Sequence, residues 1–132
     1  MRETRDAFHL AIPARDLDEA QEFYLAGLGC RLARRYADRI TLDFFGDQVV
    51  CHLSDGWERH PALYPRHFGV TFREGADWDR LLALVETRKL PLFAEPSRRF
   101  EGLVEEHRTF VVADPSNNLL EFKHYDDPRM MY

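Results

Sequence analysis

Four side chains in this sequence have the types and the spacing of metal ligands. His9 in Phe8-His9-Leu10-Ala11-Ile12 aligns with His67 in His67-Phe68-Gly69-Val70. Aligning Gln48–Leu53 with Asn117–Phe122 places His52 over Glu121. Imidazole and carboxylate groups suit first-row divalent ions, and two histidines with one carboxylate leave positions open for a substrate or dioxygen. We therefore predict a metal site made by His9, His67 and Glu121.

His52 is compatible with three roles. It can complete a set of four metal ligands, or it can stand off the metal as a general acid or base, because imidazole titrates near neutral pH. It can also be a supporting or core histidine. The sequence leaves all three open, and we name His52 as the candidate catalytic residue.

The elements that must position these residues occur twice along the chain, each time in the order βαβββ. In the first copy Phe8, Leu10 and Ile12 alternate as on a strand, and Asp16 with Glu19 has the pattern of a helix N-terminal capping box. In the second copy a helix capped by Asp77 carries an apolar stripe. The predicted strands are 7–13, 31–36, 39–44 and 48–53, then 67–72, 90–93, 108–113 and 118–123.

These copies predict an α+β fold in which paired βαβββ modules form a curved mixed sheet with helices outside and an open cup inside. We expect one domain over 1–132, with modules at 7–54 and 67–125 and a linker at 55–66. The second copy carries about ten extra residues between Pro96 and His107, and inserted loops often carry specificity.

Supporting roles follow from position and strand parity. Arg99, in the inserted segment, can pair with a substrate carboxylate, since guanidinium binds anions through two donors. Tyr125 shares the face of Glu121 and can line the cup. Tyr24 and Trp78 fit the core between helix and sheet. We expect the remaining histidines, His60, His107 and His124, to be exposed.

Composition excludes some partners. The chain has 18 basic and 23 acidic residues and a net charge of -5, with no clustered basic face of the kind that binds nucleic acid. No apolar run reaches membrane-spanning length, and the first residues lack the apolar core of a signal peptide. Cys30 and Cys51 have no metal-motif spacing, so we expect free thiols and a cytoplasmic location.

At these residues the sequence resembles the vicinal oxygen chelate superfamily of glyoxalases, extradiol dioxygenases, and fosfomycin- and bleomycin-resistance proteins. The segment Asp114-Pro115-Ser116-Asn117-Asn118-Leu119-Leu120-Glu121-Phe122 resembles its D-P-x-G-N-x-x-E-F signature. Asn117 replaces the usual Gly, and Asn also adopts positive φ in tight turns. Residues 43–53 resemble a subgroup of small extradiol-dioxygenase-like proteins, in which His usually stands at the position of Asp47.

The resemblance implies a divalent metal, Fe(II) first and Zn, Ni, Co or Mn otherwise, and a small substrate that chelates it through neighbouring oxygens. It also implies a homodimer, since small members often dimerise and some build the cup from two chains. The chain differs from each well-understood group of the superfamily in one feature. The stretch 109–112 lacks the Tyr of extradiol enzymes, and glyoxalase I has Glu at the position of His52. Bleomycin-binding relatives usually lack the metal ligands.

Three functions follow. The first is a dioxygenase-like Fe(II) enzyme that cleaves a ring or a C–C bond, with His52 as base. The second is a lyase, isomerase or epimerase of the glyoxalase kind, in which the metal is a Lewis acid. The third is a non-catalytic protein that binds a small molecule such as an antibiotic.

Overall fold

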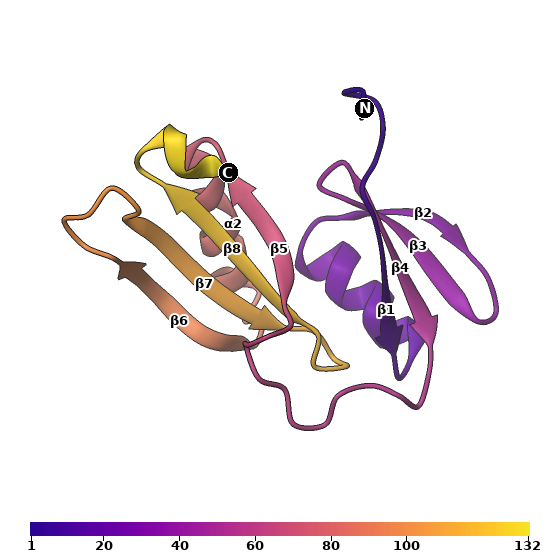
Figure 1. Ribbon diagram of the computed structural model, residues 1–132. Helices are drawn as coiled ribbons and strands as arrows, with labels where there is room; N and C mark the ends of the chain where they lie inside the picture. The colour runs from indigo at the N-terminus through magenta and orange to yellow at the C-terminus, as the bar shows by residue number, and fades with distance from the viewer.

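The computed structural model describes residues 1–132 as two four-stranded mixed sheets, each with helical segments on one face (Figure 1). The first copy of the repeat comprises β1 (His9–Ala14), α1 (Leu17–Gln21), the π-helical η1 (Glu22–Gly27), β2 (Arg31–Arg35), β3 (Arg39–Phe44) and β4 (Asp47–Leu53). The second comprises β5 (Phe68–Phe72), α2 (Gly75–Thr87), β6 (Leu92–Arg99), β7 (His107–Ala113) and β8 (Leu119–Tyr125), followed by the 3-10 helix η2 (Pro128–Met131). The predicted paired βαβββ fold is confirmed.

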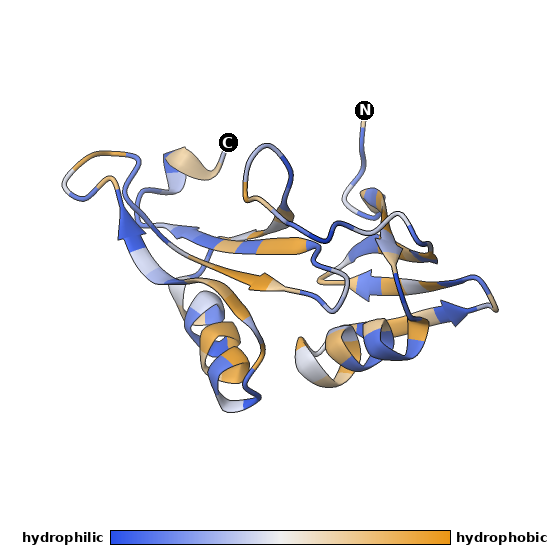
Figure 2. Cartoon of the chain, turned by 90° about the horizontal axis from the view of Figure 1, so that it is seen from below, coloured by the Kyte–Doolittle hydropathy of each residue, from blue (hydrophilic) through white to orange (hydrophobic).

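The two sheets have the same topology. Their strand orders are β1-β4-β3-β2 and β5-β8-β7-β6, so β1 and β5 are edge strands, each parallel to the last strand of its own copy. Both helical layers lie on the same side of the molecule (Figure 2). The opposite faces of the two sheets are therefore left without a covering helix.

The core lies between the helices and the sheets. Tyr24 is fully buried and Trp78 is 4% exposed, as their helical spacing predicts. Asp16 caps α1 by accepting a hydrogen bond from the backbone N–H of Glu19 at 2.8 Å. Cys51 is also buried, on the face of β4 that points to the helices. No helix has the length and apolar character needed to cross a membrane.

The two copies are joined by reciprocal contacts of their hairpins. At one end Phe44 and Phe45, at the turn between β3 and β4, pack against Phe68 and Phe72 of β5. At the other end, residues 114–118, between β7 and β8, contact the end of β1 and the turn that follows it. There Asn118 donates to the carbonyl oxygen of Pro13, and Ser116 accepts from the N–H of Arg15. These contacts fix the relative position of the two sheets.

A buried hydrogen bond strengthens this junction. The hydroxyl of Tyr24, on η1, donates to Oδ2 of Asp114 at 2.8 Å. Asp114 also accepts from the backbone N–H groups of Ser116 and Asn118, and Asn117 between them has φ +60°, as the tight turn requires. Burial raises the pKa of Asp114, while the hydrogen bonds it accepts act in the opposite direction.

Three predictions about local structure are wrong. The strand expected at 90–93 continues to Arg99, since the extra residues of the second copy pair with β7 in a longer hairpin. Helix α2 begins at Gly75 and has no side-chain cap, so Asp77 lies inside its first turn. His107 is 6% exposed and the side chain of His124 is 13% exposed, because both lie on strands of the second sheet.

Candidate functional site

An imidazole and a carboxylate meet on the open face of the second sheet. Nε2 of His67 lies 2.9 Å from Oε2 of Glu121, and these side chains are 25% and 12% exposed. Each is held by a neighbour. Nδ1 of His67 is 2.7 Å from the carbonyl oxygen of Leu63, and the hydroxyl of Thr109 donates to Oε1 of Glu121 at 2.7 Å. The two groups are thus oriented toward one another.

The hydrogen bonds around His67 determine what its second nitrogen can do. A carbonyl oxygen only accepts, so Nδ1 must carry the proton that is shared with Leu63. In the neutral ring Nε2 is then an acceptor, and it faces another acceptor, the carboxylate of Glu121. Either a proton or a metal ion must lie between the two atoms. A histidine that binds a metal through one ring nitrogen usually donates its other ring N–H to a group such as this backbone carbonyl oxygen.

Gly69 allows β5 to approach β8 at this point. A Cβ atom on Gly69 would lie 1.7 Å from the carbonyl oxygen of Glu121 and 2.7 Å from its carbonyl carbon. Gly69 is two residues from His67 and pairs with Glu121 in the parallel ladder. Its missing side chain therefore permits the backbone geometry that brings the histidine and the carboxylate together.

His9 has a comparable arrangement on the first sheet. It lies at the start of β1, directly opposite Gln48 of β4, and its Nδ1 is 2.5 Å from the side-chain oxygen of Gln48. With the amide oxygen facing the ring, Nδ1 carries the proton and Nε2 is free to bind. His9 is exposed, so its free nitrogen is accessible.

One chain does not bring the predicted ligands together. No group of three or more His, Cys, Asp and Glu side chains lies close enough to hold a metal ion. His67 and Glu121 form one pair on the second sheet, and His9 lies with Gln48 on the first. The sequence left open whether His9 meets Glu121 within one chain or across two, and in the single chain the two sheets lie edge to edge with their helices on the same side (Figures 1 and 2).

The ladder register also changes the match between the two copies. Ala11 pairs with Val50, and Gly69 pairs with Glu121. With His9 matched to His67, the residue that corresponds to Glu121 is thus Val50 rather than His52. His52 lies two residues further along β4, opposite Pro13, and is exposed. Its catalytic role stays a prediction.

The two predicted substrate residues lie at the outer part of the second sheet. The guanidinium of Arg99, at the end of β6, donates to the hydroxyl of Tyr64 at 3.3 Å. The Tyr64 ring is edge-on to His67 with centroids 5.7 Å apart. Tyr125 packs against His107 with ring centroids 4.7 Å apart and ring planes tilted by 46°. Arg99 is therefore connected through Tyr64 to the candidate ligand.

Sequence reasoning missed Tyr64 and Thr109. Tyr64 lies in the linker, where no periodicity assigns side chains to a face. Thr109 has the parity of Glu121 across the β7–β8 ladder, and this was the signal that could have identified it as a partner of the carboxylate.

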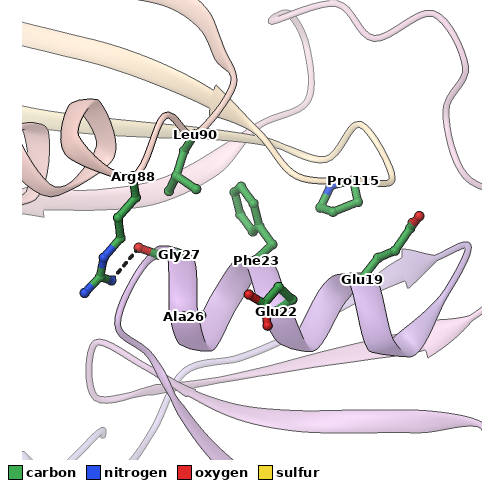
Figure 3. A pocket seen from close by; sticks show the side chains of 8 residues that line it. All are labelled: Glu19, Glu22, Phe23, Ala26, Gly27, Arg88, Leu90 and Pro115. Atoms are coloured by element: carbon green, nitrogen blue, oxygen red, sulfur yellow. Dashed lines mark hydrogen bonds between the residues drawn. The ribbon is translucent and has the colours of Figure 1, made fainter.

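Two hollows lie at the junction of the copies. One of about 340 Å³ lies between β1 and the linker and includes His67, Tyr64 and Asn118 in its lining. A more open groove of about 580 Å³ lies beside η1, where Arg88 donates to the carbonyl oxygen of Gly27 at 2.9 Å (Figure 3). None of the predicted site residues lines the second groove.

Comparisons with known proteins bear on the family and the fold. The model of the Glyoxalase/Bleomycin resistance protein/Dioxygenase superfamily matches residues 7–122. A crystal structure of a glyoxalase/bleomycin resistance protein/dioxygenase from Alicyclobacillus acidocaldarius is 66% identical, with a TM-score of 0.96 over 100% of both chains. A lactoylglutathione lyase from Agrobacterium tumefaciens is 17% identical, with a TM-score of 0.69 over 90% of this chain and 92% of that one. The fosfomycin resistance protein FosX from Listeria monocytogenes is 13% identical, with a TM-score of 0.70 over the same shares. The last two show similarity of fold alone. No curated protein matches the sequence.

Proposed function

Because the chain belongs to the Glyoxalase/Bleomycin resistance protein/Dioxygenase superfamily, we propose that it is a divalent-metal-dependent enzyme whose small substrate chelates the ion through two neighbouring oxygen atoms. The observation that carries the proposal is the pair of acceptors formed by His67 and Glu121. Two acceptors that face one another are stabilised by a cation between them, and each is already oriented by a second hydrogen bond.

The separation of these two atoms fits a shared ion. Two donors that each bind an ion at about 2.1 Å, at a right angle to one another, are about 3 Å apart. Nε2 of His67 and Oε2 of Glu121 are separated by 2.9 Å. One imidazole and one carboxylate suit Fe, Mn, Co, Ni and Zn alike.

His9 would complete the site from a second copy of the chain. Its Nε2 is free and exposed, and it lies on a sheet face that no helix of its own chain covers. In a twofold dimer the first sheet of one chain can face the second sheet of its partner, and symmetry then repeats the contact. Two equivalent sites result, each with one His9 and one His67–Glu121 pair.

The ligand set favours a dioxygenase-like reaction. His9, His67 and Glu121 would hold the ion, and a bound Fe(II) would supply open coordination positions for a chelating diol and for dioxygen. The chain's own residues would then bind and orient the diol, and His52 would accept a proton from one of its hydroxyl groups. A glyoxalase-type isomerase or lyase is the second candidate. It is less well supported, because neither His52 nor Val50, the residue of the first copy that corresponds to Glu121 in the ladder, offers a second carboxylate.

The first test is metal content, measured by elemental analysis of protein purified without oxygen. We expect about one ion per chain in the parent protein and a loss of metal in Glu121→Gln, while Glu86→Gln, on the exposed surface of α2, should keep it. Iron, followed by oxygen uptake with a panel of catechols, would support the dioxygenase, and Ni, Zn, Co or Mn would support the isomerase or lyase. Parent protein that neither contains nor takes up metal would refute the proposal.

A mixing experiment tests the shared site. His9→Ala and Glu121→Ala, each pure, should bind little metal. When the two variants are co-expressed with different tags and the mixed dimer is isolated, one of its two sites has all three ligands. We expect the mixed dimer to recover about one ion per two chains. Because a site contained in one chain would stay broken in both variants, absence of recovery would refute the two-chain arrangement.

A further inference from the structure

We propose that the substrate of this site is an anion, and that the second sheet binds its carboxylate or phosphonate group one row of residues away from Glu121. The inference rests on the proposed function for the location of the chelating oxygens. It depends on residues centred on Lys123, of which Thr109 also donates a hydrogen bond to the candidate metal ligand Glu121.

Lys123 is two residues beyond Glu121 on β8 and therefore has the same parity and the same open face. The ladders place it between two hydroxyl residues, Thr71 of β5 and Thr109 of β7, and Thr109 in turn pairs with Ser97 of β6. One ammonium group and three hydroxyl groups thus lie in one row across the four strands. The row contains no carboxylate.

The charge of Lys123 has no partner within the chain. Its side chain forms no ion pair, and its ammonium group donates to the hydroxyl of Tyr125 at 3.5 Å. The ammonium lies 5.5 Å from the centre of the Tyr125 ring, and the residue is only half-exposed. Nine of the 18 Lys and Arg side chains form ion pairs, and Lys123 is among those that do not. An unpaired, partly buried lysine beside the hydroxyl of Thr71 suits an oxyanion.

A second unpaired cation lies on the same face. Arg99 pairs with His107 in the next row of the β6–β7 ladder, forms no ion pair, and reaches the hydroxyl of Tyr64 above His67. Two residues along a strand span about 6.6 Å, so the Lys123 row lies about that far from the row of Glu121. A planar or tetrahedral oxyanion attached to a vicinal diol covers that distance.

The test compares ligands that differ only in charge. The probes are 3,4- and 2,3-dihydroxybenzoate, their neutral benzamides, and 3,4-dihydroxyphenylphosphonate, titrated calorimetrically into anaerobic, Mn(II)-loaded protein. We expect at least one benzoate or the phosphonate to bind about tenfold or more tightly than its neutral counterpart, as a charge-assisted hydrogen bond provides. The ratio of benzoate to phosphonate affinity then identifies the oxyanion.

The variants separate this proposal from the proposed function. Lys123→Met should keep its Mn(II) and its affinity for the benzamides but lose most of the preference for the anions, and Arg99→Met should lose part of it. Lys89→Met, which removes the other lysine of the chain from the loop after α2, should behave as the parent. Equal affinity for charged and neutral probes, or a preference that survives in Lys123→Met, would overturn the inference. Failure of the parent to bind Mn(II) would instead count against the metal site.

Discussion

Substituting Gly69 by Ala tests whether the approach of β5 to β8 sets the geometry of the candidate site. The added Cβ would lie 1.7 Å from the carbonyl oxygen of Glu121, and real Cβ atoms do not come closer than 3.0 Å to such an atom. One strand must therefore move by 1.3 Å or more. The obstacle is backbone of the neighbouring strand, so no flexible side chain can give way.

The displacement has two measurable consequences. Overpacking of this kind costs about 1 to 3 kcal/mol, which urea unfolding followed by circular dichroism would detect as a lower midpoint. It also changes the distance between His67 and Glu121, which is 2.9 Å. Disturbing the groups that orient metal ligands lowers metal affinity by about tenfold to a hundredfold. Metal titration of Gly69→Ala against the parent protein measures this second effect.

The first copy of the repeat provides the matched control. Ala11 occupies the corresponding position on β1, where the sheet accommodates a methyl group opposite Val50. Ala11→Gly should cost about 0.5 to 1 kcal/mol through backbone entropy and leave metal content unchanged. A Gly69→Ala protein with the parent's stability and metal affinity would refute the reasoning, because it would mean that the two strands separate without cost.

Other substitutions and reagents test the junction, the thiols and the support of the carboxylate. Tyr24→Phe removes the donor to Asp114, and we expect urea titration to show a loss of about 1 kcal/mol where Asp114 is protonated and about 2 to 3 kcal/mol where it is ionised. Since burial raises the pKa of Asp114, the contribution of this group to stability is greatest at low pH and is lost as the pH rises through its folded-state pKa. Tyr24→Phe should steepen that loss. An equal loss of stability in Tyr24→Phe with Asp114 protonated and with Asp114 ionised would contradict this. Burial raises the pKa of Cys30 and of Cys51 to about 12, so neither thiol should react with a disulfide reagent until the protein unfolds, and labelling of native protein would be the contrary result. Thr109→Val should lower metal affinity by about tenfold or more with little change in the unfolding midpoint, whereas unchanged affinity would show that its hydroxyl does not orient the ligand.

The sequence was sufficient to predict the repeat and the faces of its strands. Alternation of bulky and small residues assigned Phe122 to the core and Glu121 to the open face, and helical spacing assigned Tyr24 and Trp78 to the packed layer. These signals succeed because they depend only on the local period of a helix or strand. The extension of β6 to Arg99 has no such signal, since its polar residues are paired with β7 at the rim.

The alternation of side chains could not predict the pairing register of the strands. A period of two fixes which face a side chain occupies, but a shift of two residues preserves every face assignment. His52 and Val50 therefore have equal parity, and only the ladder opposite Ala11 distinguishes them. For the same reason, periodicity could place His9 and His67 on open faces and could not tell whether those faces meet in one chain.

The difference between the copies limits what kind of site they can build. His67 faces a carboxylate, whereas His9 faces the neutral amide of Gln48, and Val50 contributes no donor. A dimer that joins one first sheet to one second sheet thus offers three ligands to an ion, and a symmetric set of four is not available from these positions. Three ligands on one side leave the opposite side to the substrate, and the next polar group along β8 on that face is Lys123. The asymmetry of the repeat therefore places the proposed three-ligand site next to Lys123, which is the arrangement that an anionic chelating substrate would use.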